Sequence, residues 1–426
     1  MARISALASR LTPLEIYFIS AGVMAGVLDD RLAAPALGIA VIFWIARWLA
    51  PGNPLPRTPA DLAIVLLTLA ALGSLFISVQ KDLTQLLVLK LILSVALYYA
   101  VVNWTKKEAQ VRTVKAGFVL LGVALALIAP FSVEWVTIKI PLIPASIYEN
   151  FSQIVSDSIH RNVMAGYLVI LLSLIIGWLI FGWQDYRSRG RAALFAAVVL
   201  IFAILVLTQS RGALAAFGVI LLAAAVMYFR RGWLLIPLSI VAVALLVRLV
   251  GVEALIDRFS AEVSLEGWQD RFTIWSRALA MLQDFPITGV GMGLFGITAN
   301  TLYPDFFSGP RLLSHAHNLY LQVAVDLGIP GLIAWLGISI LAFHQSWQLY
   351  HRGRSLGRAE ITGIGAGLLL GQLALVTHGL LDAVTWGRVK PAPIIWGIWA
   401  LAFAAGKVYL HRQAGDTVNN EGEQSA

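Results

Sequence analysis

Long apolar segments follow one another along almost the whole chain, and they constrain the fold more than any other feature. A helix needs about 20 mostly apolar residues to cross the roughly 30 Å hydrocarbon core of a bilayer. We therefore expect an all-α integral membrane protein with about twelve transmembrane helices. The expected spans are residues 13–28, 32–49, 60–79, 86–103, 115–131, 162–182, 192–208, 212–229, 232–250, 317–345, 359–384 and 391–410.

The composition excludes a soluble enzyme. Of the 426 residues, 59% are hydrophobic and 13% are charged, whereas soluble domains carry about 25% charged residues. The chain has no cysteine, which excludes disulfides, thiol catalysis and cysteine-based metal sites. Gly363, Gly367 and Gly371 recur every four residues, and this spacing is typical of closely packed membrane helices.

The chain is expected to form one polytopic membrane domain over residues 1–412, followed by a polar cytoplasmic tail over residues 413–426. One connection of moderate length, about residues 251–316, separates the ninth and tenth spans. Arg3 and Arg10 precede the first apolar segment without a convincing cleavage site. We therefore expect a retained first helix and no signal peptide.

The distribution of basic residues predicts the topology. Most of the 31 lysine and arginine residues fall in alternate short connections, and short cytoplasmic loops are enriched in such residues. This bias predicts that both termini are cytoplasmic and that the connections 132–161 and 251–316 face the periplasm or exterior. It also accounts for the net charge of +8, so no nucleic-acid partner is expected.

Several arginines oppose this bias because they lie at or beyond the outer ends of spans. An arginine near bilayer depth is costly and usually has a partner. A polyanion at the outer leaflet would provide one. The arginines concerned include Arg161, Arg211, Arg271 and Arg388.

The segment "SHAHNLYLQVAVDLGIPG" (residues 314–331) carries the strongest local signal. His317 and Asn318 lie where a loop enters the tenth span. A histidine at an interface is either a hydrogen-bonded anchor or a general base. His315 and His317 could also converge on a metal ion, but no third ligand is close in sequence, so no metal is expected.

Two further segments place arginines beside apolar helices. Arg211 lies in the very short turn of "TQSRGALAAF", where it either extends to water or contacts a ligand. Arg271 shares a helical face with Trp275, Ala278, Leu279 and Leu282, and therefore points into a protein or ligand site. Arg277 is rotated away from that face. The nearby "GMGLFG" matches a dinucleotide motif by chance, because no strand–turn–helix unit surrounds it.

His378 and Asp382 are one helical turn apart at the outer end of the eleventh span, and Arg388 follows. These residues form either an interfacial ion-pair cluster or part of the same outer site.

Together, these segments resemble the O-antigen ligase/polymerase superfamily of bacterial membrane glycosyltransferases. The resemblance covers about residues 205–345. Its motifs are the Ser-Arg-Gly turn at residues 210–212, the helix that bears Arg271, the Pro-x-x-Gly-x-Gly turn at residues 286–291, and His-Asn followed by nine residues and Gly-x-x-Gly. His317, Asn318, Gly328 and Gly331 match the ligase pattern of this last motif. The segment "HRNVMAG" at residues 160–166 also looks like the family's approach to its sixth span.

The resemblance implies a glycan donor linked to undecaprenyl diphosphate, a lipid A–core acceptor, surrounding membrane lipids and no cofactor. It implies a multi-pass protein of the bacterial inner membrane with a periplasmic active site. A histidine would act as general base, and arginines would bind the diphosphate without a metal. The expected catalytic residues are His317, Arg211 and Arg271, and the expected substrate-binding residues are Arg161, Asn318, His315, His378 and Arg388.

Three alternatives remain open. A polymerase of the same superfamily shares these motifs, although the His-Asn pattern favours a ligase. A transporter of lipid-linked glycans would also have twelve spans, but we find neither repeated halves nor charges at the bilayer midplane. A metal-dependent glycosyltransferase would need paired carboxylates in an outer loop, and Asp29 and Asp30 form such a pair.

Overall fold

The computed structural model describes residues 2–50, 57–135, 143–149, 151, 159–251, 268–304, 314–387 and 393–411. Helices account for nearly all of this structure, with one short parallel pairing between β1 (Val133–Glu134) and β2 (Ile159–His160). The helices that build the bundle are α2 (Glu15–Leu28), α3 (Ala33–Leu49), α4 (Asp61–Ile77), α5 (Lys81–Trp104), α6 (Glu108–Ser132), α8 (Arg161–Phe181), α9 (Ser188–Leu207), α10 (Arg211–Tyr228), α11 (Leu235–Val250), α15 (Leu319–Ser355), α16 (Ala359–Gly379) and α17 (Ile394–Gly406).

Each of the twelve expected spans coincides with a helix. Among the described residues, ten helices are long and apolar enough to cross a membrane. The remaining two predicted spans correspond to shorter apolar helices, at Asp61–Ile77 and Ile394–Leu410. The prediction of an all-α, multi-pass membrane protein is confirmed, with ten full-length spans in place of about twelve. The eleventh span also ends at Gly379, five residues before its predicted end.

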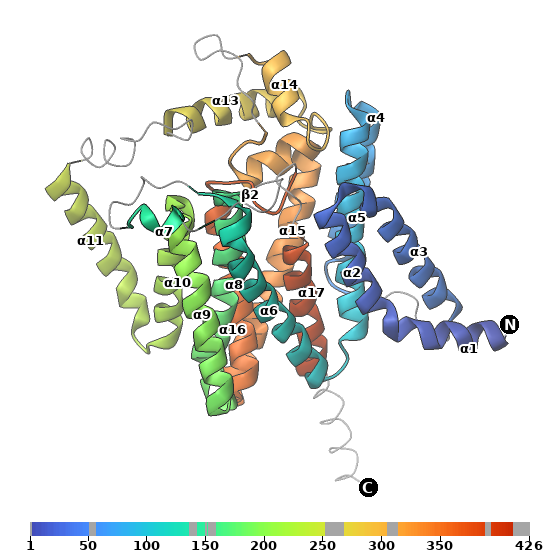
Figure 1. Cartoon of the computed structure of the whole chain (residues 1–426), viewed down its shortest axis with the longest axis horizontal. Coiled ribbons are helices and arrows are strands. Elements are labelled where there is room, and N and C mark those ends of the chain that lie inside the picture. Colours follow the sequence, from blue (N-terminus) through green and yellow to red (C-terminus); the bar gives the residue numbers. More distant parts are fainter. Residues whose placement is uncertain are drawn as a thin grey trace, which may run out of the picture.

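The centre of the bundle is the pair α8 and α16, most of whose residues are buried. Glycines allow the two backbones to approach: a Cβ on Gly177 of α8 would lie 2.4 Å from the Cα of Gly367 of α16. Any larger side chain there would force the helices apart, which confirms the packing role predicted for the α16 glycines. By contrast, α11 lies at the edge of the bundle (Figure 1) and has no buried residue.

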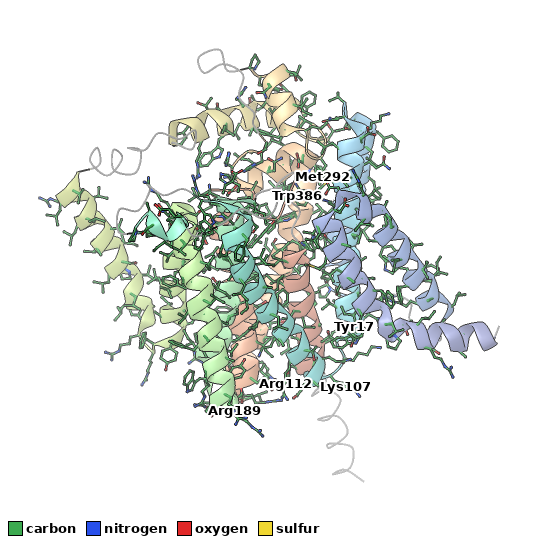
Figure 2. The ribbon with its side chains drawn as sticks, in the orientation of Figure 1. Tyr17, Lys107, Arg112, Arg189, Met292 and Trp386 are labelled. Atoms are coloured by element: carbon green, nitrogen blue, oxygen red, sulfur yellow. The ribbon has the colours of Figure 1, made fainter. Side chains whose placement is uncertain are left out.

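The two ends of the bundle differ in character. Lys107, Arg112 and Arg189 lie at one end, whereas Met292 and Trp386 lie toward the other (Figure 2). The end that carries Trp386 is covered by α13 (Trp268–Asp284) and α14 (Phe295–Thr301), which lie beyond the bundle helices (Figure 1). The described structure also contains the short helices α1 (Ala2–Leu11) and α7 (Ser146–Glu149), four short 3-10 turns and the π-helical turn Lys407–His411.

The amphipathic helix α13 packs its buried face onto α14 and α15. Ile274, Ala278 and Met281 are buried in a cluster with Phe295, Ala316 and Val325. The predicted apolar face was rotated slightly wrongly, because Leu279 is about half exposed. Arg277 joins α13 to the end of α14. Its Nε donates to the Tyr303 carbonyl (2.6 Å), and its Nη2 donates to the Ala299 carbonyl (2.9 Å).

Two glycine-containing turns lock together where α15 is kinked. Gly328 has φ 71° and ψ −179°, which interrupts α15. A Cβ at this position would lie 2.2 Å from the carbonyl oxygen of Ile287. The Ile329 N–H donates to the Pro286 carbonyl (2.7 Å), and the Val290 N–H donates to the Val325 carbonyl (2.8 Å). The close backbone contact therefore explains why the kink in α15 needs glycine at position 328.

Candidate active site

Three helices begin at the covered end of the bundle and meet around the end of α16. Arg161 and Arg211 are the first residues of α8 and α10, and Leu319 is the first residue of α15. Leu319 packs against Gly379, where an added Cβ would lie 3.1 Å from its side chain. Helix N-termini carry partial positive charge. Two of these three termini also carry an arginine, so the region attracts anions.

His378 lies at the centre of this arrangement. It is buried between α8 and α10: an added Cβ on Gly166 would lie 2.8 Å from its Nε2, and one on Gly212 would lie 3.9 Å from its Nδ1. Arg271 of α13 is close enough to act on His378 electrostatically. The structure thus brings Arg271 and His378, which are more than 100 residues apart in the sequence, to one place.

The central feature of the site is a pair of loops that face each other. We call residues 314–318 the histidine loop and residues 380–387 the aspartate loop. His315 Nε2 is hydrogen-bonded to Asp382 Oδ1 across the two loops (2.9 Å), while its Nδ1 is hydrogen-bonded to the Ser314 hydroxyl (2.7 Å). His317 directs its Nδ1 toward the same Asp382 oxygen at 3.8 Å. The two imidazole rings are 4.1 Å apart between centroids.

The two histidines differ in how they are used. Both ring nitrogens of His315 are engaged, by Asp382 and by Ser314. His317 is more accessible, with 22% of its side chain exposed against 10% for His315. A side chain that removes a proton from a substrate must reach that substrate. Of the two, His317 is therefore better placed to act as a base.

Asp382 is held in its ionised form. Burial alone would raise the pKa of this carboxyl, but the hydrogen bond from His315 and the charges of His315 and His317 outweigh burial and hold the pKa below its usual range. Its Oδ1 also accepts the N–H of Ala383 (2.8 Å). An ionised carboxylate fixed beside an imidazole orients it and stabilises its protonated form.

Asn318 has a clear local role. Its Oδ1 accepts from the N–H groups of Tyr320 and Leu321 (both 3.0 Å) and so caps the N-terminus of α15. Its Nδ2 donates to the Leu380 carbonyl (3.2 Å) in the aspartate loop. The side chain thus joins the two loops, and its predicted contact with substrate stays a prediction.

Unusual backbone conformations gather at this site. Within the described parts of the chain, positive φ at residues other than glycine occurs at Gln209, His317 and Thr385. Gln209 precedes the Ser210–Arg211 turn, and the other two belong to the histidine and aspartate loops. Non-glycine residues avoid this region unless their surroundings impose it, and such strain concentrates at functional sites. The three loops are therefore held in shape at some cost to stability.

The predicted arginines differ in burial. Arg161 is only 5% exposed, whereas Arg211 and Arg271 are partly buried. Arg388 lies outside the described residues. The motifs that carry Arg211, Arg271 and the histidines thus converge at one end of the bundle, as expected.

The sequence reasoning missed the main partner of the histidines. It grouped Asp382 with His378 and Arg388, but in the structure Asp382 faces His315, 67 residues earlier in the sequence, and His317. The sequence does contain one indication of such a role: Asp382 is a lone carboxylate next to a long apolar span, and a charged group near the bilayer is costly unless it has a partner.

The same three side chains could hold a metal ion. One ligand atom each from His315, His317 and Asp382 lie within 4.8 Å of one another. No third ligand is close to these histidines in sequence, but Asp382 supplies one from a distant segment, so the expectation that no metal is bound stays a prediction. The direct 2.9 Å hydrogen bond between His315 and Asp382 equally suits a histidine–carboxylate pair without metal. Transfer activity in excess chelator distinguishes a metal site from a metal-free histidine–carboxylate pair.

Comparison with known proteins finds sequence similarity in the segment that carries much of this site. Residues 196–336 match the family described as O-Antigen ligase. The chain is also similar to the exopolysaccharide production protein ExoQ of Rhizobium meliloti (strain 1021), with 28% identity over 168 residues. That alignment covers 38% of this chain and about a third (35%) of the relative's length. The family match includes Arg211, Arg271, the histidine loop and the kink at Gly328.

Proposed function

We propose, from the membership of residues 196–336 in the O-antigen ligase/polymerase superfamily, that this membrane protein is a glycosyltransferase of the ligase type. The donor is a glycan carried on undecaprenyl diphosphate, and the acceptor is a sugar hydroxyl on lipid A–core. The carrier lipid lies in the surrounding bilayer, and its diphosphate lies at the outer interface. The protein belongs in the bacterial inner membrane, with the reaction on the periplasmic side and both termini in the cytoplasm.

In the proposed reaction, the acceptor oxygen attacks the anomeric carbon of the donor sugar. The bond between that carbon and the diphosphate oxygen breaks, and the electron pair leaves with the diphosphate. The proton of the acceptor hydroxyl passes to His317, and undecaprenyl diphosphate is released. Attack from the face opposite the leaving group inverts the anomeric configuration.

The observation that carries this proposal is the contact of both histidines with the ionised Asp382 (2.9 and 3.8 Å). At 3.8 Å the carboxylate is too far away to hydrogen-bond His317, but its negative charge stabilises the imidazolium that forms when His317 accepts a proton. General base catalysis of this kind contributes typically 10²–10⁴-fold to a rate. We assign His317 as the base, and His315 as the residue that fixes the position of Asp382.

The leaving group needs positive charge. Guanidinium groups bind phosphate oxygens through paired hydrogen bonds, and preorganised charge stabilises the transition state more than water can. Arg211 and Arg271 fill this role in the proposal, with Arg161, His378 and Arg388 supporting the donor. The N-termini of α8 and α10 add partial positive charge at the same place. The reaction then needs no metal ion.

A second candidate is a polymerase of the same superfamily. The similarity to a protein named for exopolysaccharide production favours it, because such a product is a polymer. A polymerase would take two copies of the lipid-linked glycan, and it would use the same cationic end of the bundle. Only the acceptor separates the two candidates.

Deletion of the gene in its host tests the choice. A strain without a ligase makes lipopolysaccharide with a bare core and accumulates lipid-linked glycan that is already polymerised. A core that carries a single repeat unit would identify a polymerase instead. Unchanged lipopolysaccharide with loss of an exopolysaccharide would also exclude the ligase and assign an exopolysaccharide polymerase. Expression of the wild-type gene from a plasmid is the control.

A further inference from the structure

A second set of contacts, separate from the histidine–aspartate pair, joins the histidine loop to the aspartate loop. The N–H of Ala316, between the two histidines, donates to Gln322 Oε1 (2.7 Å). Gln322 Nε2 donates to Asp326 Oδ1 (2.9 Å). Trp386 Nε1 of the aspartate loop donates to Asp326 Oδ2 (2.9 Å). Three hydrogen bonds thus connect the two loops through the part of α15 that precedes the kink at Gly328.

All members of this connection are buried. Asp326 is 0% exposed, Gln322 1% and Trp386 3%. The backbone N–H of Gly293 also faces the Asp326 carboxylate. In the aspartate loop, Gly387 adopts φ 68°, and a Cβ there would lie 3.6 Å from Asp326 Oδ2. The carboxylate therefore lies between the glycine turn at residues 286–293 and both loops of the site.

The order of hydrogen-bond donors and acceptors determines which side chains fit at positions 322 and 326. Ala316 and Trp386 present N–H groups at the two ends, so the side chains between them must supply acceptors at both ends. The Gln322 amide satisfies Ala316 with its oxygen, which leaves its NH₂ facing residue 326. Only a carboxylate at 326 can accept from both the amide and the indole. An asparagine at 326 would place two NH₂ groups against each other.

A carboxylate in this position is not explained by packing. Burying a charge is unfavourable unless hydrogen bonds compensate it, and apolar side chains of similar volume often serve stability at least as well. Fully satisfied buried polar networks do, however, fix one arrangement of the parts they join. The parts joined here are the two loops on which the proposed base and its carboxylate lie.

We propose that Gln322, Asp326 and Trp386 are positioning residues that hold the histidine loop in register with the aspartate loop for glycan transfer. The inference rests on the proposed function, since it concerns the same site. These residues act through His317 and Asp382 and do not contact substrate. Misplacement of reacting groups by about 1 Å can lower a rate by about 10²-fold.

An exchange of two isosteric residues tests this proposal. Asp326→Asn and Gln322→Glu each break one hydrogen bond of the connection. The double variant Gln322→Glu/Asp326→Asn restores all three bonds: the new carboxylate at position 322 accepts from the Ala316 N–H and from the new amide at position 326, whose oxygen accepts from Trp386. We expect each single variant to lower kcat by about 10- to 100-fold with KM for the donor changed less than about threefold. The double variant should regain at least about tenfold over either single variant.

A second measurement does not depend on activity. Diethyl pyrocarbonate modifies accessible imidazoles, and mass spectrometry reports each histidine separately. We expect His315 and His317 to react at least about threefold faster in each single variant, because loss of one hydrogen bond loosens the loop, and to return toward the wild-type rate in the double variant. His344 and His351 are exposed near the other end of α15 and should react equally in all variants. Trp386→Phe is a further single-bond variant if either substitution at 322 or 326 prevents folding.

The outcomes separate the proposal from the proposed function. If wild-type protein transfers no glycan but the modification rates rise and recover as expected, the transfer assignment fails and the connection stands. If wild-type protein is active and Asp326→Asn is equally active, the positioning role is wrong. A folded double variant that stays as slow and as reactive as the single variants would also overturn it.

Discussion

The contact between the Gly328 kink and the 286–291 turn allows a prediction with a matched control. Gly328 and Gly357 share nearly the same positive φ, 71° and 65°. An added Cβ at Gly328 would lie 2.2 Å from the Ile287 oxygen and 2.5 Å from its carbonyl carbon, whereas one at Gly357 would meet nothing within 4 Å. An alanine at Gly357 meets only the strain of a positive φ, whereas an alanine at Gly328 also meets a ψ of −179°, which is essentially restricted to glycine, and a collision between two backbones.

The expected effects differ in size. A left-handed conformation costs an alanine about 1–2 kcal/mol, which is the whole effect expected at Gly357. At Gly328 the turn must also move away, which breaks the bonds from Ile329 to Pro286, from Val290 to Val325 and from Gly291 to Asp326. With about 1 kcal/mol for each bond and about 1–3 kcal/mol for the strained backbone, we expect Gly328→Ala to lose about 4–6 kcal/mol in all. The histidine loop packs on this region through Ala316, so transfer should fall by about 10²-fold as well.

The assay is thermal unfolding of both variants in detergent, together with glycan transfer. One kcal/mol corresponds to about 2–4 °C in proteins of 150–250 residues, and to less in longer chains. Gly357→Ala should therefore melt within about 4 °C of wild type and transfer glycan normally. Gly328→Ala should melt far lower or fail to accumulate as folded protein. Equal melting temperatures and equal activities would refute the proposed docking of the two turns.

Further predictions concern the arginines, the metal and the topology. Arg211→Lys and Arg271→Lys should each weaken donor binding and turnover by at least about tenfold, because lysine lacks the bidentate guanidinium; wild-type activity of both would leave these arginines without a role at the diphosphate. Transfer should continue in excess chelator, and restoration of a chelated sample by zinc, magnesium or manganese would instead assign the His315, His317 and Asp382 cluster to a metal. The chain has no cysteine, so a membrane-impermeant maleimide should label Thr301→Cys in intact spheroplasts and Ser188→Cys only after permeabilisation, and the opposite pattern would invert the topology.

Much of the fold could be predicted because the bilayer limits the choices. Every predicted apolar stretch coincides with a helix, since only the lengths and hydropathies of the segments were needed. The helices α4 and α17 are shorter than full spans: α4 ends at Ile77, two residues before its predicted end, and α17 begins only after Pro393. Hydropathy marks a segment as apolar and does not give the last residue of a helix.

The site could be predicted only in part. Motif order placed Arg211 and His317 at the ends of spans and Arg271 in the connection between them, and the structure has these segments at one end of the bundle. The pairing of His315 with Asp382 could not be predicted, because it depends on how two irregular loops fold toward each other. The buried face of α13 was placed slightly wrongly for a related reason: Trp275 and Leu279 suggested an apolar stripe, but the helix docks through Ile274 and Met281.

The role of Asp326 was also beyond sequence reasoning. It lies nine residues after His317, and Gln322 links it to the backbone beside that histidine. Such a link can be predicted only when the positions of all three side chains, Gln322, Asp326 and Trp386, are known. Gly328 was noted as part of a motif, and only the structure explains it, through the contact with Ile287.

Transfer by purified protein in a defined system tests the central claim most directly. Wild type, His317→Ala and Asp382→Asn are incubated with undecaprenyl-diphosphate-linked glycan and lipid A–core, and both products are measured by mass spectrometry. Wild type should release one undecaprenyl diphosphate for each glycan joined to lipid A–core. His317→Ala should bind the donor normally and lose at least about 10²-fold in turnover, and Asp382→Asn should also be slow because the imidazolium loses its carboxylate. Activity of His317→Ala within about tenfold of wild type would remove this residue as the base and contradict the mechanism.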